Sequence, residues 1–86
     1  PFNPSTIIKY QLPVTSNIKI NLYNLLGEFV AELINTTQNA GSYEFIFNQN
    51  SRNIKLSSGT YFYSFSATSN DGKQKYNDIK KMLLIK

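Results

Sequence analysis

The sequence predicts an all-β fold on three observations. Apolar side chains recur at every second position in several segments, which is the period of a half-buried strand. Residues that favour turns, mainly glycine, proline, asparagine and serine, separate these segments. No segment has the pattern of a helix that would connect parallel strands. We therefore expect an immunoglobulin-like antiparallel β-sandwich of about seven short strands.

Four segments show the alternation directly: residues 6–12, 17–23, 42–48 and 60–68. Each places its apolar residues on one face and mainly polar residues on the other, as in a strand with one face on a core and one toward water. The core faces expected from these segments consist of Ile8, Tyr10, Leu12, Ile18, Ile20, Leu22, Tyr43, Phe45, Phe47, Tyr61, Tyr63, Phe65 and Ala67.

The other strands are predicted from weaker patterns. Residues 28–34 depart from strict alternation, and we interpret them as a short strand with a bulge. Residues 54–56 are expected to form a brief seventh strand. Asn70-Asp71-Gly72 predicts a tight hairpin that leads into the last strand, which ends in the apolar run Met82 to Ile85.

Composition argues against catalysis. The 86 residues form one small domain with 41% hydrophobic residues, enough apolar surface for a core. There is no cysteine for a disulfide or a thiolate metal site, and no histidine to act as a general base or metal ligand. Glu28 and Glu32 are interpreted as solvated charges on one strand. Asn70 and Asp71 are turn residues, with a pair of calcium ligands as the alternative. We expect no enzyme, no cofactor, no metal and no small-molecule substrate.

The net charge of +4 is concentrated near the end of the chain, where five lysines accompany two aspartates between residues 71 and 86. Such a segment either attracts an acidic surface or protects an edge strand from pairing with other strands. Tyr23, Phe62 and Tyr76 are the candidates for an exposed aromatic platform, with packing inside the sandwich as the alternative. Aromatic residues are too sparse among the lysines for a nucleic-acid interface, so no nucleic-acid partner is expected.

Several segments match one family in order and spacing. Residues 1–13 read P-F-N-P-S-T-I-I-K-Y-Q-L-P, residues 58–63 read S-G-T-Y-F-Y, and residues 80–86 read K-K-M-L-L-I-K. Between them, residues 20–33 include a tyrosine, a Leu-Gly pair, a valine and a leucine at family spacing. Together these segments resemble the type A C-terminal sorting domain of the type IX (Por) secretion system. The chain departs from the family at Phe47-Asn48, where a tryptophan often occurs.

The resemblance implies that residues 1–86 are a single C-terminal sorting domain cut from a larger exported protein. Its implied role is a non-catalytic signal that directs an attached N-terminal passenger through the periplasm and across the outer membrane of a Gram-negative bacterium. The implied partners are the outer-membrane secretion translocon and a surface sortase, and the implied location is the cell surface or the extracellular medium. The candidate recognition residues are Ser58, Gly59, Lys80, Lys81 and Lys86.

Recognition is expected to use the last strand, whose unpaired backbone groups a partner can extend while its lysines steer the encounter. The alternative function is an immunoglobulin-like accessory module, a spacer or polysaccharide-binding domain, attached to a secreted hydrolase. The two differ in position, because a sorting signal must be terminal whereas a spacer can be internal.

Overall fold

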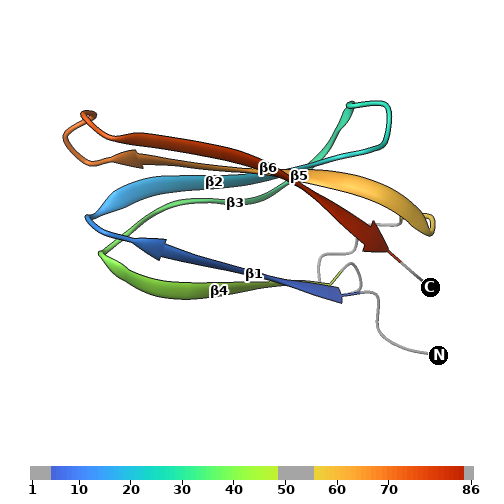
Figure 1. Ribbon diagram of the computed structural model, residues 1–86, viewed down its shortest axis with the longest axis horizontal. Helices are drawn as coiled ribbons and strands as arrows, with labels where there is room; N and C mark the ends of the chain where they lie inside the picture. Colours follow the sequence, from blue (N-terminus) through green and yellow to red (C-terminus); the bar gives the residue numbers. More distant parts are fainter. Residues whose placement is uncertain (1–4, 49–55, 85–86) are drawn as a thin grey trace.

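The computed structural model describes residues 5–48 and 56–84, which form two antiparallel sheets that pack as a sandwich (Figure 1). This described part contains no helix, and hence none long and apolar enough to cross a membrane. The predicted all-β sandwich is therefore confirmed. Its six strands are β1 (Ser5–Leu12), β2 (Ser16–Tyr23), β3 (Phe29–Gln38), β4 (Gly41–Asn48), β5 (Gly59–Ser69) and β6 (Lys75–Leu84).

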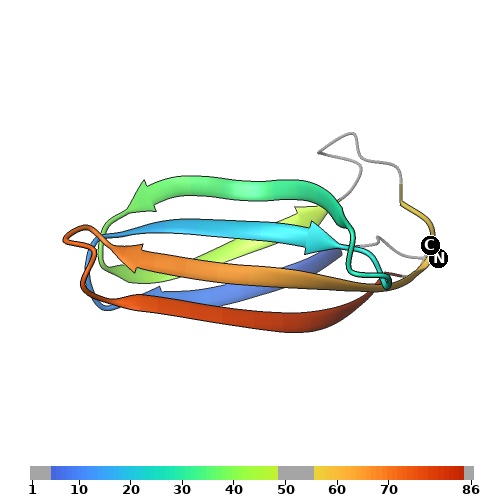
Figure 2. The same cartoon turned by 90° about the horizontal axis from the view of Figure 1, so that it is seen from above.

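The topology is immunoglobulin-like. A small sheet pairs β1 with β4, and a larger sheet has the order β3-β2-β5-β6, as Figure 2 shows from above. Within the larger sheet, β2–β3 and β5–β6 are hairpins. The connections β1–β2, β3–β4 and β4–β5 each cross from one sheet to the other. In an immunoglobulin domain, strands B and E pair in one sheet and strands C, F and G form the other. Strands β1 and β4 therefore take the places of B and E, and β2, β5 and β6 those of C, F and G.

A tyrosine at the start of β5 supports this correspondence. The Tyr61 hydroxyl donates a hydrogen bond of 2.8 Å to the backbone carbonyl of Ser57, four residues earlier in the chain. This is the arrangement of the tyrosine corner, in which a tyrosine near the start of strand F is bonded to the backbone upstream of it. Tyr61 is 8% exposed, so its ring also belongs to the core. The S-G-T-Y segment thus has a structural role of its own.

The core forms from the faces that alternation predicts. Ile18, Ile20 and Leu22 of the central strand β2 are fully buried. The other predicted residues are either buried or packed against the buried cluster, which confirms all the expected core faces. The core is completed by residues that alternation alone did not identify: Leu33, Leu56, Met82 and Leu84.

Strand β3 is bulged as predicted but is not short, because it spans ten residues. Its pairing with β2 shifts at two points, where Leu33 and Val30 have no direct partner in the register. The predicted end at residue 34 is therefore wrong. The polar residues that follow continue the ladder, since their backbones pair with the start of β2 whatever their side chains are.

The expected seventh strand lies mostly outside the described residues. Of residues 54–56, only Leu56 is described; it belongs to no strand and is 7% exposed, within the core. Six strands rather than seven are therefore seen in the part of the chain that the structure describes.

The β5–β6 connection is wider than the tight hairpin expected, because residues 70–74 separate the two strands. Gly72 has a φ of 76°, as the turn requires. The Asp71 carboxylate accepts hydrogen bonds from the Ser69 hydroxyl at 2.6 Å and the Lys73 N–H at 2.9 Å. These two donors hold the pKa of Asp71 below its ordinary value, because they stabilise the charged carboxylate. Asp71 acts as a turn residue here.

Candidate recognition surface

Strand β6, which carries Lys80 and Lys81 of the predicted recognition residues, alternates between the two faces of the larger sheet. Met82 and Leu84 lie on the inner face, toward the small sheet, and are 6% and 2% exposed. Ile79 and Leu83 lie on the outer face and are 68% and 65% exposed. The end of β6 is therefore both part of the core and part of the surface.

The structure brings some of the predicted recognition residues together and separates others. Lys80 and Lys81 are adjacent in a strand, so their side chains lie on opposite faces of the sheet. Ser58 is exposed, and Gly59 pairs with the last residue of β6, so this turn adjoins the end of the strand. Lys86 lies outside the described residues. Ser58, Gly59 and Lys81 thus belong to one end of the larger sheet, whereas Lys80 faces inward.

A row of aromatic residues crosses the outer face next to Lys81. The register places Phe29 opposite Tyr23, Tyr23 opposite Phe62, and Phe62 opposite Lys81. The rings of Tyr23 and Phe29 meet edge to face at 6.1 Å, and Phe29 is 61% exposed. We call these four residues and Leu83 the outer patch. Exposed apolar side chains gathered in this way, beside a cation, are typical of a protein-binding surface.

The sequence identified part of this patch. Tyr23 and Phe62 were candidates for an exposed platform, with packing inside the sandwich as the alternative, and both are half-buried on the outer face. Tyr76 is 58% exposed, but it lies on the inner face with its ring 6.1 Å from that of Phe65. Phe29 was missed because the bulges of β3 obscure its alternation. The turn between Tyr23 and Phe29 could have identified Phe29 as exposed, because a hairpin places these two residues opposite each other.

The β2–β3 turn extends the exposed apolar surface. The Asn24 side-chain oxygen accepts hydrogen bonds from the backbone N–H groups of Leu26 at 3.0 Å and Glu28 at 2.9 Å. Gly27, with a φ of 84°, donates its N–H to the Asn24 carbonyl at 2.9 Å. This local network holds Leu25 and Leu26 outward, at 66% and 83% exposed. The turn lies at the end of the molecule where β6 finishes (Figure 1).

Among the described residues β6 is an edge strand, and the hairpin shows which of its backbone groups face outward. The Ser69 N–H donates to the Gln74 carbonyl at 2.8 Å, so this opposed pair is a hydrogen-bonded one. In an antiparallel ladder such pairs alternate with pairs whose backbone groups point away from each other. The N–H and carbonyl groups turned away from β5 therefore belong to Lys75, Asn77, Ile79, Lys81 and Leu83.

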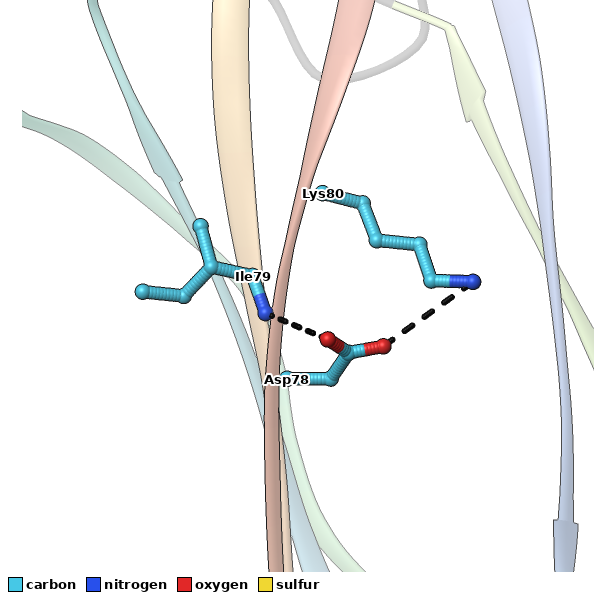
Figure 3. Close-up of polar contacts among 3 residues, drawn as sticks. All are labelled: Asp78, Ile79 and Lys80. Carbon is cyan, nitrogen blue, oxygen red and sulfur yellow. Dashed lines mark hydrogen bonds and ion pairs between the residues drawn. The ribbon is translucent and has the colours of Figure 1, made fainter.

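One of these outward groups is occupied by a side chain from the same strand. The Asp78 carboxylate accepts a hydrogen bond of 2.9 Å from the Ile79 N–H and lies 3.9 Å from the Lys80 ammonium (Figure 3). A charged side chain placed at a strand edge discourages another strand from adding there. Asp78 therefore protects the middle of β6, and the edge beyond it, at Lys81 and Leu83, is the part that a partner strand can reach.

Replacing Asp78 with alanine is expected to increase self-association of the protein. The variant frees the Ile79 N–H for a partner strand and removes a charge that would be brought near a second copy. We expect the association constant to rise about tenfold, measured by sedimentation equilibrium. Asp78→Asn is the control, because its side-chain oxygen can still accept from the N–H. Equal association of the wild type and Asp78→Ala would contradict the protective role.

The carboxylates engage in separate local contacts. Glu28 accepts from the Asn24 amide at 2.8 Å, and Glu44 lies 3.8 Å from the Lys9 ammonium. Within residues 5–48 and 56–84, no three histidine, cysteine, aspartate or glutamate residues are grouped so that they can hold a metal ion. The surface is thus defined by its strand edge, its aromatic row and its lysines.

Comparisons with protein-family models, with curated proteins and with solved structures found no match for this chain.

Proposed function

We propose that the chain is a non-catalytic secretion and sorting signal that directs an attached passenger across the outer membrane by the type IX secretion system to the cell surface. The proposal is supported by where the family-like segments lie. Residues 58–63 open β5 and residues 80–86 include the end of β6, and these strands are neighbours, with Gly59 opposite Leu84. Two segments far apart in the sequence thus contribute to one end of one sheet, beside the outer patch.

In this proposal the translocon binds the outer patch and the open part of the β6 edge. Apolar contact with Phe29 and Leu83 would supply affinity, because both side chains are largely exposed and Phe29 lies against the half-buried ring of Tyr23. Lys81 would steer an acidic partner surface toward the edge. The surface sortase would act on the same exported domain, and the passenger would precede it in the chain.

A truncation is a poor test of this proposal. Removing residues 81–86 deletes Met82 and Leu84, which are core residues, so lost export would report lost folding as readily as lost recognition. Substitutions on the outer face avoid this problem, because the side chains of Ile79 and Leu83 lie in solvent.

The double variant Lys81→Glu with Leu83→Glu is expected to reduce export at least about tenfold, because it reverses the charge and makes the patch polar. The measurement is surface and medium fluorescence of a periplasm-directed fluorescent protein fused ahead of the domain, in a host with the type IX system. The matched control is Asn17→Glu with Lys19→Glu, which makes the same charge change two residues apart on the outer face of β2.

Equal periplasmic retention of the wild-type fusion and the variant, in cells that export a known tag, would contradict the proposal. That result would favour the alternative, an immunoglobulin-like accessory module that acts as a spacer or binds polysaccharide for a secreted hydrolase. The alternative is supported by the immunoglobulin-like topology, which fits a spacer as well as a signal.

A further inference from the structure

A cavity of about 380 Å³ opens between β1 and β6, on the side of the sandwich away from the outer patch. Every residue from Ile8 to Val14 lines it, whereas β5 contributes only alternate residues, from Tyr63 to Ser69. Contact with consecutive residues of a strand means contact along its edge, while contact with alternate residues means contact with one face. The cavity is therefore a groove that runs along the edge of β1 opposite its partner β4, with the inner face of β5 and β6 as its floor.

The groove exists because the two sheets differ in width. Among the described residues β1 pairs only with β4, and this two-stranded sheet leaves part of the inner face of the four-stranded sheet uncovered. Tyr76 consequently lies on the inner face and is still 58% exposed. In the immunoglobulin order A-B-E-D, the strand next to B on this side is the first strand, A. Strand β1 takes the place of B, so the groove lies where an additional strand would pair.

We propose that this groove binds an extended peptide segment of another protein, which adds to the free edge of β1 as a further strand. Backbone hydrogen bonds to β1 would hold the segment, and its alternate side chains would pack on the floor. The site lies on the opposite side of the sheet from the outer patch, so the proposal goes beyond the export role and does not depend on it.

The floor of the groove is preformed. The rings of Tyr10 and Phe65 lie 4.9 Å apart, and Phe65 lies 6.1 Å from Tyr76. The Tyr10 hydroxyl donates a hydrogen bond of 2.7 Å to the Gln38 side chain, which fixes the ring that borders the edge. Ala67 leaves room between these rings and the hairpin. A peptide side chain of the size of valine or isoleucine therefore meets an ordered apolar surface, at little cost in side-chain entropy.

The charges around the groove favour an acidic segment. Its lining includes three lysines, Lys9, Lys75 and Lys80, and one carboxylate, that of Asp78. The Lys80 ammonium lies 3.9 Å from Asp78, and the Lys9 ammonium lies 3.8 Å from Glu44, so the excess positive charge around the groove is partly neutralised. Figure 3 shows the side chains of Asp78 and Lys80 on one side of β6 and that of Ile79 on the other. A segment with apolar residues at alternate positions and carboxylates near its ends would match both the floor and the rim. A long strand edge favours a peptide over a polysaccharide, which has no backbone N–H and carbonyl ladder to pair with it.

The test uses the 86-residue chain and a synthetic peptide of eight residues, the length of β1, in which valine alternates with threonine between terminal glutamates. Binding is followed by amide NMR signals. We expect the amide signals of residues 8–12, of Val14 and of Ala67 to shift and those of β3 to stay unchanged. A peptide with the same composition but broken alternation, and one with N-methyl groups at alternate backbone nitrogens, should each bind at least about tenfold more weakly.

Charge reversal provides a second measurement on a protein that stays folded. Lys80→Glu should weaken binding of the acidic peptide about three- to fivefold at low salt, with a smaller effect at high salt, because Lys80 lies on the groove side of β6. The matched control is Lys81→Glu, which makes the same charge change at the adjacent residue on the outer face and should leave binding unchanged.

Three results would overturn the proposal: equal binding of the broken-alternation peptide, shifts confined to the outer patch, or equal effects of Lys80→Glu and Lys81→Glu. Titration with a cello-oligosaccharide tests whether the groove binds a polysaccharide instead of a peptide. Shifts of the groove signals with the sugar but not with the peptide would also overturn it.

Discussion

Replacing Met82 and Leu84 together with alanine is expected to abolish cooperative folding of the protein near 37 °C. Both side chains lie on the inner face of β6 and are almost fully buried. Truncating a buried methionine or leucine to alanine costs about 2–5 kcal/mol, because apolar contact is lost and a cavity remains. Two such losses approach or exceed the roughly 5–15 kcal/mol that stabilises a typical domain. Urea and thermal unfolding followed by circular dichroism would measure the effect.

The control for this prediction is the neighbouring pair in the same strand. Lys81→Ala with Leu83→Ala removes side chains on the outer face, where Leu83 is 65% exposed, and should change the free energy of unfolding by less than about 1 kcal/mol. Equal destabilisation by the two pairs would show that the alternation of β6 is wrong. In the export experiment the two pairs of substitutions distinguish lost folding from lost recognition, because only Met82→Ala with Leu84→Ala should change the free energy of unfolding substantially.

Phe47→Ala is expected to cause the largest loss of stability among single substitutions in β4. Phe47 belongs to β4 of the small sheet, and its fully buried side chain is part of the core between the two sheets. The substitution should cost about 3–5 kcal/mol. In a domain of this size such a loss lowers the midpoint of thermal unfolding by more than about 10 °C.

Ile46→Ala is the matched comparison for Phe47→Ala, because residue 46 is the adjacent position in β4 and is 60% exposed. Its unfolding midpoint should stay within about 3 °C of the wild-type value. A midpoint as low as that of Phe47→Ala would mean that the outer face of the small sheet is covered in solution, for example by a second copy.

Much of the fold was predictable because strands repeat with a period of two. That period alone assigned Ile18, Ile20 and Leu22 to one buried face, which the structure confirms. It failed at β3, where two bulges break the alternation and obscure the exposed position of Phe29. The same period implies that adjacent lysines in a strand diverge, so the separation of Lys80 from Lys81 could have been read from the sequence.

The pairing of strands that are distant in the chain was not predictable from local pattern. Alternation says which face of a strand is apolar, but it does not say that β2 pairs with β5 or β1 with β4. Those pairings come from packing the apolar faces of the whole chain at once. The outer patch depends on them, because the register of three strands aligns its rings and Lys81.

The sequence by itself determined the strand period, the turn positions and most of the core residues, because these follow from local chemistry and from the alternation of side chains across a strand. Only the tertiary structure decided which edges are free and which faces are uncovered. The groove along β1 and the protected edge at Asp78 both arise from the unequal widths of the two sheets and the position of β6 at an edge. These are properties of the assembled sandwich, in which each strand's surroundings are set by segments far away in the chain.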